Sequence, residues 1–322
     1  MNFAGLGAKK GIDDTGFGTN AQTEGHRLTN KDGSVNLRKT GLPIWQRLSF
    51  YHYFISMKRW RFLASIFLFY TTVNILFACI YLLIGVDHLN GITAAGTGFE
   101  QFTTAFFFSS QTLTTVGYGH ISPVGLVANI VAALESFIGI LSFAMVTGLM
   151  YGRFSRPRAF LLFSEHAVVS PFKEGNALMV RLASAKNNHL TDVEAQLILA
   201  FHVGEEGKVY TRFFPLTLDI KRISSMAVNW TLVHEIDANS PLWGVSENQL
   251  REARAEVMVF IRGFDDTFSN TVQQRTSYQA SEIVYGARFV PMFRRSDDMR
   301  TTILDLADLG RHEPAPLKES KI

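Results

Sequence analysis

The chain has 322 residues, of which 47% are hydrophobic and 18% are charged, and its formal net charge is +3 at pH 7. This composition is too apolar for a disordered protein and more apolar than that of most soluble enzymes. The small basic excess, with no Arg- and Lys-rich groove in the pattern, argues against a nucleic-acid partner. Because Cys79 is the single cysteine, no disulfide can form within the chain.

The two ends of the chain are polar. Residues 1–40 are rich in Gly, Asn and Thr and lack the apolar core of a signal peptide, so we expect a disordered cytoplasmic tail. Residues 311–322 have a similar character, and we expect a second tail there. Residues 41–60 differ, because their apolar positions fall on one helical face and predict an interfacial helix on the inner leaflet. These positions are Ile44, Leu48, Tyr51 and Ile55.

Two segments are long and apolar enough to cross a membrane. Residues 62–84 contain no charge and would extend roughly 34 Å as a helix, which exceeds a hydrocarbon core of about 30 Å. Residues 124–152 form the second span, with Glu135 as its one carboxylate. An intramembrane acid usually faces protein or water. Either Glu135 attracts cations near an ion path, or it pairs with hydroxyls such as those of Ser109 or Ser110.

The basic residues that flank the two spans predict the orientation of the chain. No Lys or Arg occurs between the spans, so both termini are expected in the cytoplasm, in a multi-pass protein of the cell (inner) membrane. The flanking residues are Arg47, Lys58, Arg59 and Arg61 before the first span, and Arg153, Arg156 and Arg158 after the second.

A further apolar stretch between the spans is too short to cross a membrane. Residues 99–113 have helix-compatible spacing and three consecutive Phe residues, which predicts a re-entrant helix. Non-helical backbone at membrane depth is tolerated only where protein or a water-filled cavity receives it. The glycine-containing segment 115–119 would therefore return along a cavity, and residues 61–152 would form one pore domain.

The return segment reads Thr115-Val116-Gly117-Tyr118-Gly119, a composition that suits the binding of a dehydrated cation. Rings of backbone carbonyls can replace the hydration shell of K⁺, and the two glycines supply the backbone freedom that aims carbonyls at an axis. The Thr115 hydroxyl would add an oxygen at the inner end, while Val116 and Tyr118 would pack behind the segment. One copy cannot surround an ion, so we expect a homotetramer with cyclic symmetry.

The second half of the chain, residues 153–310, has the pattern of a soluble all-β domain. Apolar and polar residues alternate over 191–201, which indicates a half-buried strand. Many short strands with little helix predict a β-sandwich. Similar runs occur at 177–182, 209–214, 229–234 and 256–261.

The residues of this half do not form a catalytic pattern. Its histidines are scattered without metal-ligand spacing, and no dinucleotide-binding glycine motif follows a strand. Glu235 and Asp237 would share one face of a strand, and we interpret them as a structural or inter-subunit polar pair rather than as catalytic acids. We therefore expect neither an enzyme nor an enzymatic cofactor.

The pore segment and the β-rich half together resemble the inward-rectifier potassium channels, in particular their prokaryotic members. The resemblance covers residues 43–308. The eukaryotic members have a cysteine pair around the pore loop that this chain lacks, which favours the bacterial type. Besides the filter, the resemblance rests on Arg59-Trp60-Arg61; on Arg156-Pro157-Arg158 with Leu162-Phe163-Ser164; on Val233-His234-Glu235-Ile236-Asp237 with Ser240-Pro241-Leu242; and on Arg275-Thr276-Ser277-Tyr278 with Glu282-Ile283 and Tyr285-Gly286.

The resemblance implies an immunoglobulin-like cytoplasmic domain and a K⁺-selective channel that closes at its inner helix bundle. It places Gly139 at a proposed hinge, and Phe143, Thr147 and Tyr151 along the pore, where four copies could close the inner mouth. From the residues alone, this four-residue stripe could instead face lipid or a neighbouring helix. The family's strong rectifiers have an acid at the position of Phe143, so we expect polyamine or Mg²⁺ block to be weak at most.

The resemblance also makes the flanking arginines a site for an anionic phospholipid headgroup, such as that of a phosphoinositide. Each basic group near an anionic surface contributes about 1 kcal/mol. Positive-inside anchoring would explain the same charges. The residues are Arg59, Arg61, Arg153, Arg156 and Arg158. The sequence also leaves two other functions open: a non-selective cation channel, and a membrane-tethered sensor whose pore does not conduct.

Overall fold

The computed structural model describes residues 27–38, 40–41, 43, 49–92, 96–156, 159–186, 189–205, 208–226, 228–296 and 300–319, without the side chains of 203–205 and 208–210. The chain divides into two units, which are described separately. The helical unit comprises Thr40–Arg156, and the β unit comprises Met1–Lys39 with Pro157–Ile322.

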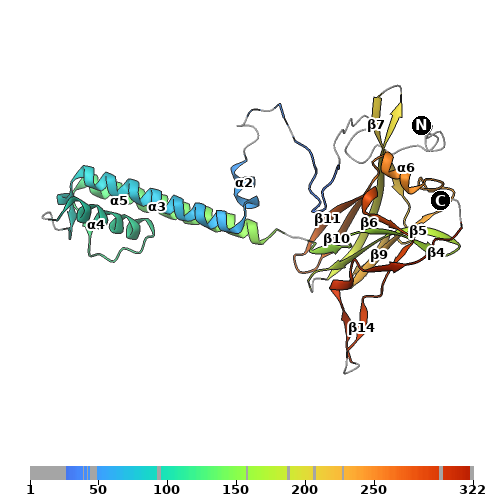
Figure 1. Ribbon diagram of the computed structural model, residues 1–322. Coiled ribbons are helices and arrows are strands. Elements are labelled where there is room, and N and C mark those ends of the chain that lie inside the picture. Colours follow the sequence, from blue (N-terminus) through green and yellow to red (C-terminus); the bar gives the residue numbers. More distant parts are fainter. Residues whose placement is uncertain are drawn as a thin grey trace. The chain divides into compact units, whose positions relative to one another are not determined.

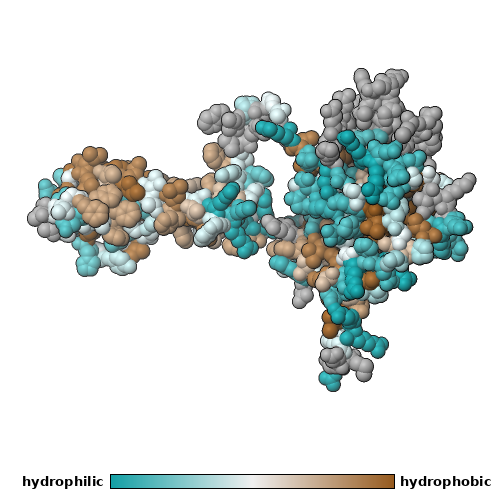
Figure 2. Space-filling view, viewed as in Figure 1, coloured by the Kyte–Doolittle hydropathy of each residue, from teal (hydrophilic) through white to brown (hydrophobic). Residues whose placement is uncertain are grey.

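Three long helices make up most of the helical unit (Figure 1). α3 (Arg59–Ile84) and α5 (Leu126–Phe154) have mean hydropathies of 2.1 and 2.0 and are long and apolar enough to cross a membrane. α4 (Gly98–Leu113) has 16 residues and is too short to cross. Hydrophobic side chains gather over this unit (Figure 2). The three predicted helices are confirmed, and each begins within three residues of its expected start.

The first turn of α4 follows from its sequence. Thr97 precedes the helix, and its side chain accepts the amide of Glu100, while the Glu100 carboxylate accepts the amide of Thr97 at 2.8 Å. This reciprocal capping box pairs two amides that a helix start leaves unsatisfied. Further along, Phe108 packs against Tyr81 of α3, with ring centroids 5.0 Å apart.

Short elements complete the helical unit. α2 (Phe50–Ser56) precedes α3, and the side chain of Ser49 caps its start. The strands β1 (Leu89–Asn90) and β2 (Ser122–Pro123) pair antiparallel and close the segment that contains α4; the 3₁₀ turn η1 (Val86–His88) precedes β1. Ile44, Arg47 and Leu48 of the predicted interfacial helix lie outside the described residues.

The β unit contains two five-stranded sheets. One has the order β11-β10-β6-β7 with β8 beside β6, and the other has the order β12-β4-β5-β3 with β9 beside β5. Their strands are β3 (Leu161–Phe163), β4 (Ala167–Phe172), β5 (Gly175–Ser184), β6 (Leu190–Glu205), β7 (Lys208–Leu216), β8 (Arg222–Met226), β9 (Asn229–Ile236), β10 (Glu256–Asp265), β11 (Asn270–Gln279) and β12 (Ile283–Tyr285). The five strands predicted from period-two patterns lie within β5, β6, β7, β9 and β10.

The smaller elements of the β unit are two further strand pairs and short helical turns. They are β13 (Ala287–Phe289) with β16 (His312–Pro314), β14 (Phe293–Arg295) with β15 (Thr302–Leu304), α6 (Glu247–Glu252), η2 (Ala280–Glu282) and η3 (Leu306–Asp308).

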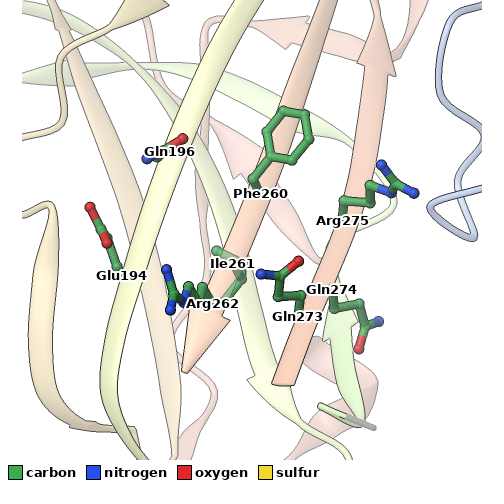
Figure 3. Close-up of a pocket in the computed structure, with 8 residues that line it drawn as sticks. All are labelled: Glu194, Gln196, Phe260, Ile261, Arg262, Gln273, Gln274 and Arg275. Carbon is green, nitrogen blue, oxygen red and sulfur yellow. The ribbon is translucent and has the colours of Figure 1, made fainter. Parts of the chain in front are cut away.

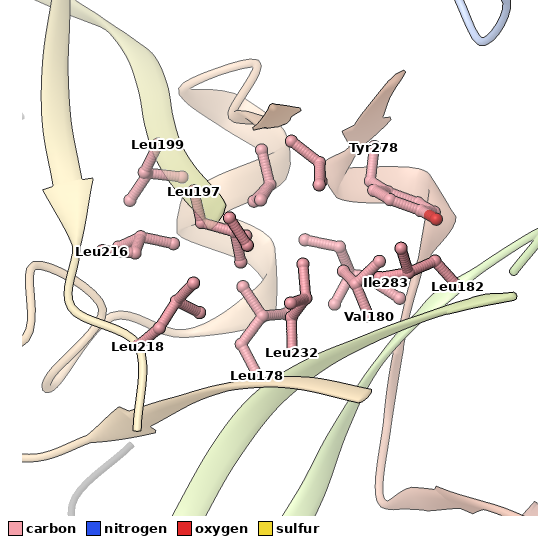
Figure 4. Close-up of a cluster of buried hydrophobic side chains, with 14 of the residues drawn as sticks. Leu178, Val180, Leu182, Leu197, Leu199, Leu216, Leu218, Leu232, Tyr278 and Ile283 are labelled. Atoms are coloured by element: carbon pink, nitrogen blue, oxygen red, sulfur yellow. The ribbon is translucent and has the colours of Figure 1, made fainter. Parts of the chain in front are cut away.

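Leucines from both sheets form one continuous core between them (Figure 4). Leu178 and Leu182 come from β5, and Leu197 and Leu199 come from β6; all four side chains are buried. Every second residue of β9 is buried, as expected of a strand with one face on a core. The predicted β-sandwich is therefore confirmed.

The expectation of a structureless tail is wrong for residues 27–38, which pack on the β unit. The buried Glu256 carboxylate, at the start of β10, accepts the backbone N–H groups of Leu28 and Thr29 at 2.6 and 3.0 Å. Leu28 is itself buried in a small apolar cluster that includes Met258. These main-chain bonds to one distant acid leave no trace in local composition. Residues 1–26 lie outside the described residues.

The expected tail at the other end is also wrong for residues 311–319. β16 pairs antiparallel with β13, and Ala315 is buried. The backbone N–H of Lys318 donates to the Asn176 side chain at 3.0 Å. The Asn176 side chain donates in return to the Lys318 carbonyl at 3.1 Å, so an edge strand and this reciprocal pair of hydrogen bonds fix a segment that has few apolar residues.

Candidate functional site

The segment 115–119 follows directly from the last turn of α4, and its first amides are tied to that turn. The N–H of Thr115 donates to the carbonyl of Thr112 at 3.0 Å. The N–H groups of Val116 and Gly117 both donate to the carbonyl of Gln111, at 3.0 and 3.3 Å. α4 therefore determines where the segment begins and which way its amides point.

The backbone φ angle alternates in sign along this segment. Thr115, Gly117 and Gly119 have φ angles of 60°, 53° and 82°, whereas Val116 and Tyr118 have no positive φ. Positive φ at every second residue turns successive carbonyls toward the same side, unlike the alternating carbonyls of an ordinary strand. Thr115 is not glycine, so its left-handed conformation costs about 1–2 kcal/mol. Such a cost is typical of a functional constraint.

The carbonyl oxygens of 115–119 accept no hydrogen bond from any described residue. The side chains of Val116 and Tyr118 are 55% and 73% exposed in the single chain. Unpaired carbonyls are tolerated at membrane depth only where an ion, water or protein satisfies them. The segment thus presents a set of carbonyl ligands and two apolar side chains that this chain alone does not cover.

A buried polar cluster joins α3, α4 and α5. Glu135 of α5 is fully buried and accepts the Tyr81 hydroxyl at 2.7 Å and the Ser109 hydroxyl. The Ser109 oxygen also lies 3.0 Å from the side-chain oxygen of Asn74. The structure shows the second of the two alternatives expected for Glu135, a pairing with hydroxyls. The serine involved is Ser109 rather than Ser110. The hydroxyl oxygen of Ser110 instead lies 2.5 Å from the hydroxyl oxygen of Tyr70.

Asn74 and Tyr81 were not expected from the sequence to belong to this cluster. They are seven residues apart on α3 and therefore share one face of the helix. Two polar side chains at that spacing in an uncharged span were the available signal, together with Glu135 on the other span.

Gly139 lies where α5 approaches the end of α4. A Cβ at this position would collide with the carbonyl oxygen of Leu113, and α5 runs through Gly139 as one helix. At Gly148, on the same helix, a Cβ would meet nothing within 4 Å. The structure thus gives Gly139 a packing role, in contact with the turn from which segment 115–119 emerges.

The other residues of the predicted gate stripe are exposed in the single chain. Phe143 is 77% exposed and Tyr151 is 73% exposed, and Thr147 between them is exposed as well. A cavity of about 440 Å³ lies beside Phe143, and Thr115 at the start of segment 115–119 lines it too. Phe143 and the inner end of segment 115–119 therefore border one space.

The flanking basic residues differ in their contacts. Arg59, Arg61 and Arg156 are exposed. Arg153 is half-buried and donates to backbone carbonyls at the end of α2. Arg158 lies outside the described residues.

The acidic residues singled out in the β unit have structural contacts. Glu235 forms an ion pair with Lys173 at 3.2 Å, and Asp237 accepts the amides of Asn239 and Ser240, both at 2.9 Å. Within the described residues, no group of three or more His, Cys, Asp or Glu side chains could hold a metal ion.

His234 is buried beside these acids. Its Nδ1 donates to the Thr217 carbonyl at 2.7 Å, so Nε2 accepts the Ser240 hydroxyl at 2.8 Å. Burial lowers the pKa of His234, against smaller opposing effects of the Thr217 carbonyl, Asp237 and Glu235.

A hollow of about 510 Å³ opens on the β6-β10-β11 sheet (Figure 3). Its lining includes the charged side chains of Glu194, Arg262 and Arg275. The arrangement offers polar contacts but no paired nucleophile and base, so nothing in it indicates catalysis.

The chain matches two protein families. Residues 161–314 match the inward rectifier potassium channel C-terminal domain, and residues 68–156 match the ion channel family. It is 36% identical over 292 residues to "Inward rectifier potassium channel Kirbac3.1" of Paramagnetospirillum magnetotacticum, covering 90% of this chain and 96% of the relative. This chain belongs to the inward rectifier potassium channel family.

Eukaryotic family members are similar over shorter shares of their length. The human "G protein-activated inward rectifier potassium channel 2" is 30% identical over 303 residues, which cover 84% of this chain and 69% of that one. The human "Inward rectifier potassium channel 18" is 33% identical over 256 residues, which cover 73% and 58%. These relatives are channels rather than enzymes. Membership and the two apolar helices make the chain a membrane protein, and the family name implies K⁺ as the permeant ion.

Proposed function

We propose that four copies of this chain form a K⁺-selective channel whose filter is segment 115–119. The observation that carries the proposal is the alternating backbone of that segment, with unpaired carbonyls and amides tied to α4. Four such segments around an axis would supply the oxygen rings that replace the hydration shell of K⁺. The exposed Val116 and Tyr118 side chains would pack against the neighbouring copies.

The gate of this proposed channel lies on α5. Phe143 and Tyr151 are large, exposed and about two helical turns apart, so four copies could narrow the inner mouth and exclude water. Anionic phospholipid headgroups bind the exposed Arg59, Arg61 and Arg156, and the cytoplasmic β unit acts with them on the gate. Both termini face the cytoplasm, as the positive-inside pattern favours.

Ion flux through the purified protein in liposomes tests the selectivity. We expect uptake under a K⁺ gradient and little under a Na⁺ gradient, with a response to added phosphatidylglycerol. Equal uptake of both ions would make the protein a non-selective cation channel. No uptake with or without anionic lipid would favour a sensor with a non-conducting pore.

Two glycine variants test whether segment 115–119 is responsible for the selective uptake of K⁺. Gly117→Ala forces a side chain into a φ of 53°, so we expect loss of selective uptake. Gly98→Ala, at the start of α4, meets nothing within 4 Å and should behave as wild type. A selective Gly117→Ala variant would move the filter elsewhere.

The assembly is tested separately by light scattering in detergent. A homotetramer has a protein mass of about 144 kDa, four times the 36.1 kDa chain. A monomeric or dimeric mass for a protein that conducts K⁺ would overturn the fourfold filter.

A further inference from the structure

One hydroxyl hydrogen stands between two oxygens in the buried polar cluster of α3, α4 and α5. The hydroxyl oxygen of Ser109 lies 3.0 Å from Oδ1 of Asn74 and is also hydrogen-bonded to Oε1 of Glu135. All three side chains are fully buried. A serine hydroxyl has one hydrogen to donate, so Ser109 can satisfy only one of these two oxygens. The other oxygen needs a second hydrogen from within the cluster.

The orientation of the Asn74 amide makes Oδ1 an acceptor that needs Ser109. Nδ2 of Asn74 donates to the carbonyl of Tyr70, one turn earlier on α3, at 2.7 Å. The reversed amide would place Oδ1 against that carbonyl, and two acceptors cannot form a hydrogen bond. Oδ1 therefore faces Ser109, whose hydroxyl is its one hydrogen-bond partner among the described residues.

An ionised Glu135 leaves this cluster incomplete. When Ser109 donates to the Glu135 carboxylate, Oδ1 of Asn74 faces the Ser109 oxygen with no hydrogen between them. A buried polar atom without a hydrogen bond is unfavourable, and a buried carboxylate without a cation is more so. Across the part of the chain that the structure describes, Glu135 contacts no Lys, Arg or His side chain.

A proton on Glu135 completes the cluster. The carboxyl group then donates to Ser109, Ser109 donates to Asn74, and Asn74 donates to the Tyr70 carbonyl. The Tyr81 hydroxyl donates to the second carboxyl oxygen, Oε2, at 2.7 Å. Each contact in this chain has one donor and one acceptor. Hydrogen bonds that follow one another in this way also polarise and strengthen one another.

We propose that Glu135 is a proton-binding site, and that the bound proton turns the Ser109 hydroxyl from Glu135 to Asn74. The proton comes from water and bonds to Oε1, and no other covalent bond changes. Tyr81 is the titratable side chain that contacts Glu135 from α3, and the contact from α4, Ser109, does not titrate. Glu135 is then a neutral acid at pH 7 that links α5 through Ser109 to α3, rather than a negative charge that attracts cations.

Infrared spectroscopy of the full-length protein in liposomes detects this proton directly. A neutral carboxylic acid has a carbonyl stretch that is separate from the bands of a carboxylate, and ordinary Asp and Glu side chains are ionised at pH 7. We expect the carboxylic-acid band in wild type at pH 7 and its loss in Glu135→Gln. A wild type without the band, or a band that persists in Glu135→Gln, would overturn the proposal.

Two adjacent serines of α4 provide a matched pair of variants. Ser109→Ala removes the acceptor of the carboxyl proton, so the band should move to higher frequency. Ser110→Ala is the control, because the Ser110 oxygen lies 2.5 Å from the Tyr70 hydroxyl and does not contact Glu135. A band at the wild-type frequency in Ser109→Ala, or an equal shift in both variants, would mean that Glu135 does not donate to Ser109.

The role of Asn74 is tested by a pH titration of the same band. Asn74→Leu removes Oδ1, so Ser109 can donate to an ionised Glu135 without leaving an oxygen unpaired. The midpoint at which the band disappears should fall by about one pH unit, which corresponds to one unpaired buried acceptor. Thr72→Val, at an exposed position of α3, should titrate as wild type. An unchanged midpoint in Asn74→Leu would contradict the proposed coupling to Asn74.

Ion uptake shows whether the neutral acid suffices for the channel, and this arm alone rests on the proposed function. The Glu135→Gln side chain can accept from Tyr81 and donate to Ser109, as the protonated acid does. We expect it to retain the melting temperature and the K⁺ to Na⁺ uptake ratio that Glu135→Ala loses. Loss of selective uptake in a stable Glu135→Gln would show that the ionised acid is required. A wild type without uptake would instead count against the proposed function, and the infrared band would still decide the proton site.

Discussion

Ser109 of α4 donates its hydroxyl to the carboxylate of Glu135 on α5, inside the helical unit. Ser109 stands two residues before Gln111, whose carbonyl holds the amides of Val116 and Gly117. The Glu135 carboxylate has no Lys, Arg or His partner among the described residues, so hydroxyls alone stabilise it. A buried acid on α5 thus contacts the same end of α4 that holds the amides of segment 115–119.

Removal of the Tyr81 hydroxyl, the second hydroxyl that Glu135 accepts, should loosen the proposed filter segment 115–119. Tyr81→Phe removes the 2.7 Å bond to Glu135, and a typical intramolecular hydrogen bond contributes about 0.5–1.5 kcal/mol. We expect a lower melting temperature in detergent and a smaller ratio of K⁺ to Na⁺ uptake in liposomes. Tyr53→Phe, on the exposed face of α2, is the control. If Tyr81→Phe keeps the wild-type uptake ratio, the cluster serves folding only.

Gly139 is expected to be intolerant of a methyl group for a reason unrelated to hinge motion. Gly139→Ala would drive a Cβ into the Leu113 carbonyl, and overpacking of this kind costs about 1–3 kcal/mol. We expect reduced thermal stability and altered K⁺ selectivity, measured as above. Gly148→Ala should change neither. A Gly139→Ala variant with intact stability but slower opening would support the hinge interpretation instead.

Local patterns in the sequence predicted the elements of this protein well. Span length, the short apolar stretch and period-two alternation identified α3, α4, α5 and the main strands, because each depends only on neighbouring residues. The alternating φ of segment 115–119 was also expected in part, since Gly117 and Gly119 allow it. Thr115 shows the same conformation without any sequence signal for it.

Contacts between distant segments were not predictable in this way. The sequence assigns Arg153 and Arg156 the same expected role as basic residues at the membrane surface. In the structure, Arg153 donates to the carbonyl of Phe54 near the end of α2, 99 residues earlier in the chain. Residues 27–38 had the composition of a tail, yet Glu256 holds them through two backbone amides. Both cases depend on backbone groups, which every residue has and no composition reveals.

Tyr151 provides a direct test of the proposed gate. Tyr151→Ala removes an exposed ring near the inner end of α5 and should raise basal K⁺ uptake by widening the inner mouth. Phe154→Ala truncates a side chain of similar exposure, 70%, on the same last turn and is the control. Equal increases in both variants would point to a general loosening of α5. Unchanged uptake in Tyr151→Ala would place the gate elsewhere.

His234 should make the β unit less stable in mild acid. Its pKa is lowered from 6.5 in the folded state, so the unfolded chain binds the proton more readily. The stabilisation is fully present above about pH 6.5 and is lost as the pH falls toward the folded pKa. His234→Asn keeps a donor for the Thr217 carbonyl and cannot titrate.

Melting temperatures at pH 7.5 and pH 5.5 check this expectation. The decrease in melting temperature from pH 7.5 to pH 5.5 should be smaller in His234→Asn than in wild type. The variant His189→Asn, at an exposed position, should show the same decrease as wild type. A residual decrease is expected from His202, whose pKa is also lowered, by burial and by Arg254. An equal decrease in wild type and His234→Asn would contradict the assignment.

The N-terminal segment should detach when Glu256 loses its charge. Glu256→Gln replaces one carboxylate oxygen with an NH₂ group. The backbone N–H of either Leu28 or Thr29 then faces this NH₂ group, which is a donor, and loses its acceptor. A buried donor left unpaired costs about 1–3 kcal/mol. We expect faster tryptic cleavage after Arg27 and Lys31, followed by mass spectrometry of the released peptides. Arg27 itself pairs with Glu282 at 2.9 Å, so Glu282→Gln should act in the same direction.

The exposed Glu252→Gln, on α6, is the matched control for this experiment and should leave the cleavage rate unchanged. Cleavage after Arg27 and Lys31 at the same rate in Glu256→Gln and wild type would mean that Glu256 does not hold the segment. Asn36→Ala, at an exposed position of the segment, should have little effect. Glu256 contacts backbone amides of the segment, whereas Glu282 contacts the Arg27 side chain, so the cleavage rates of Glu256→Gln and Glu282→Gln measure the backbone and the side-chain contributions separately.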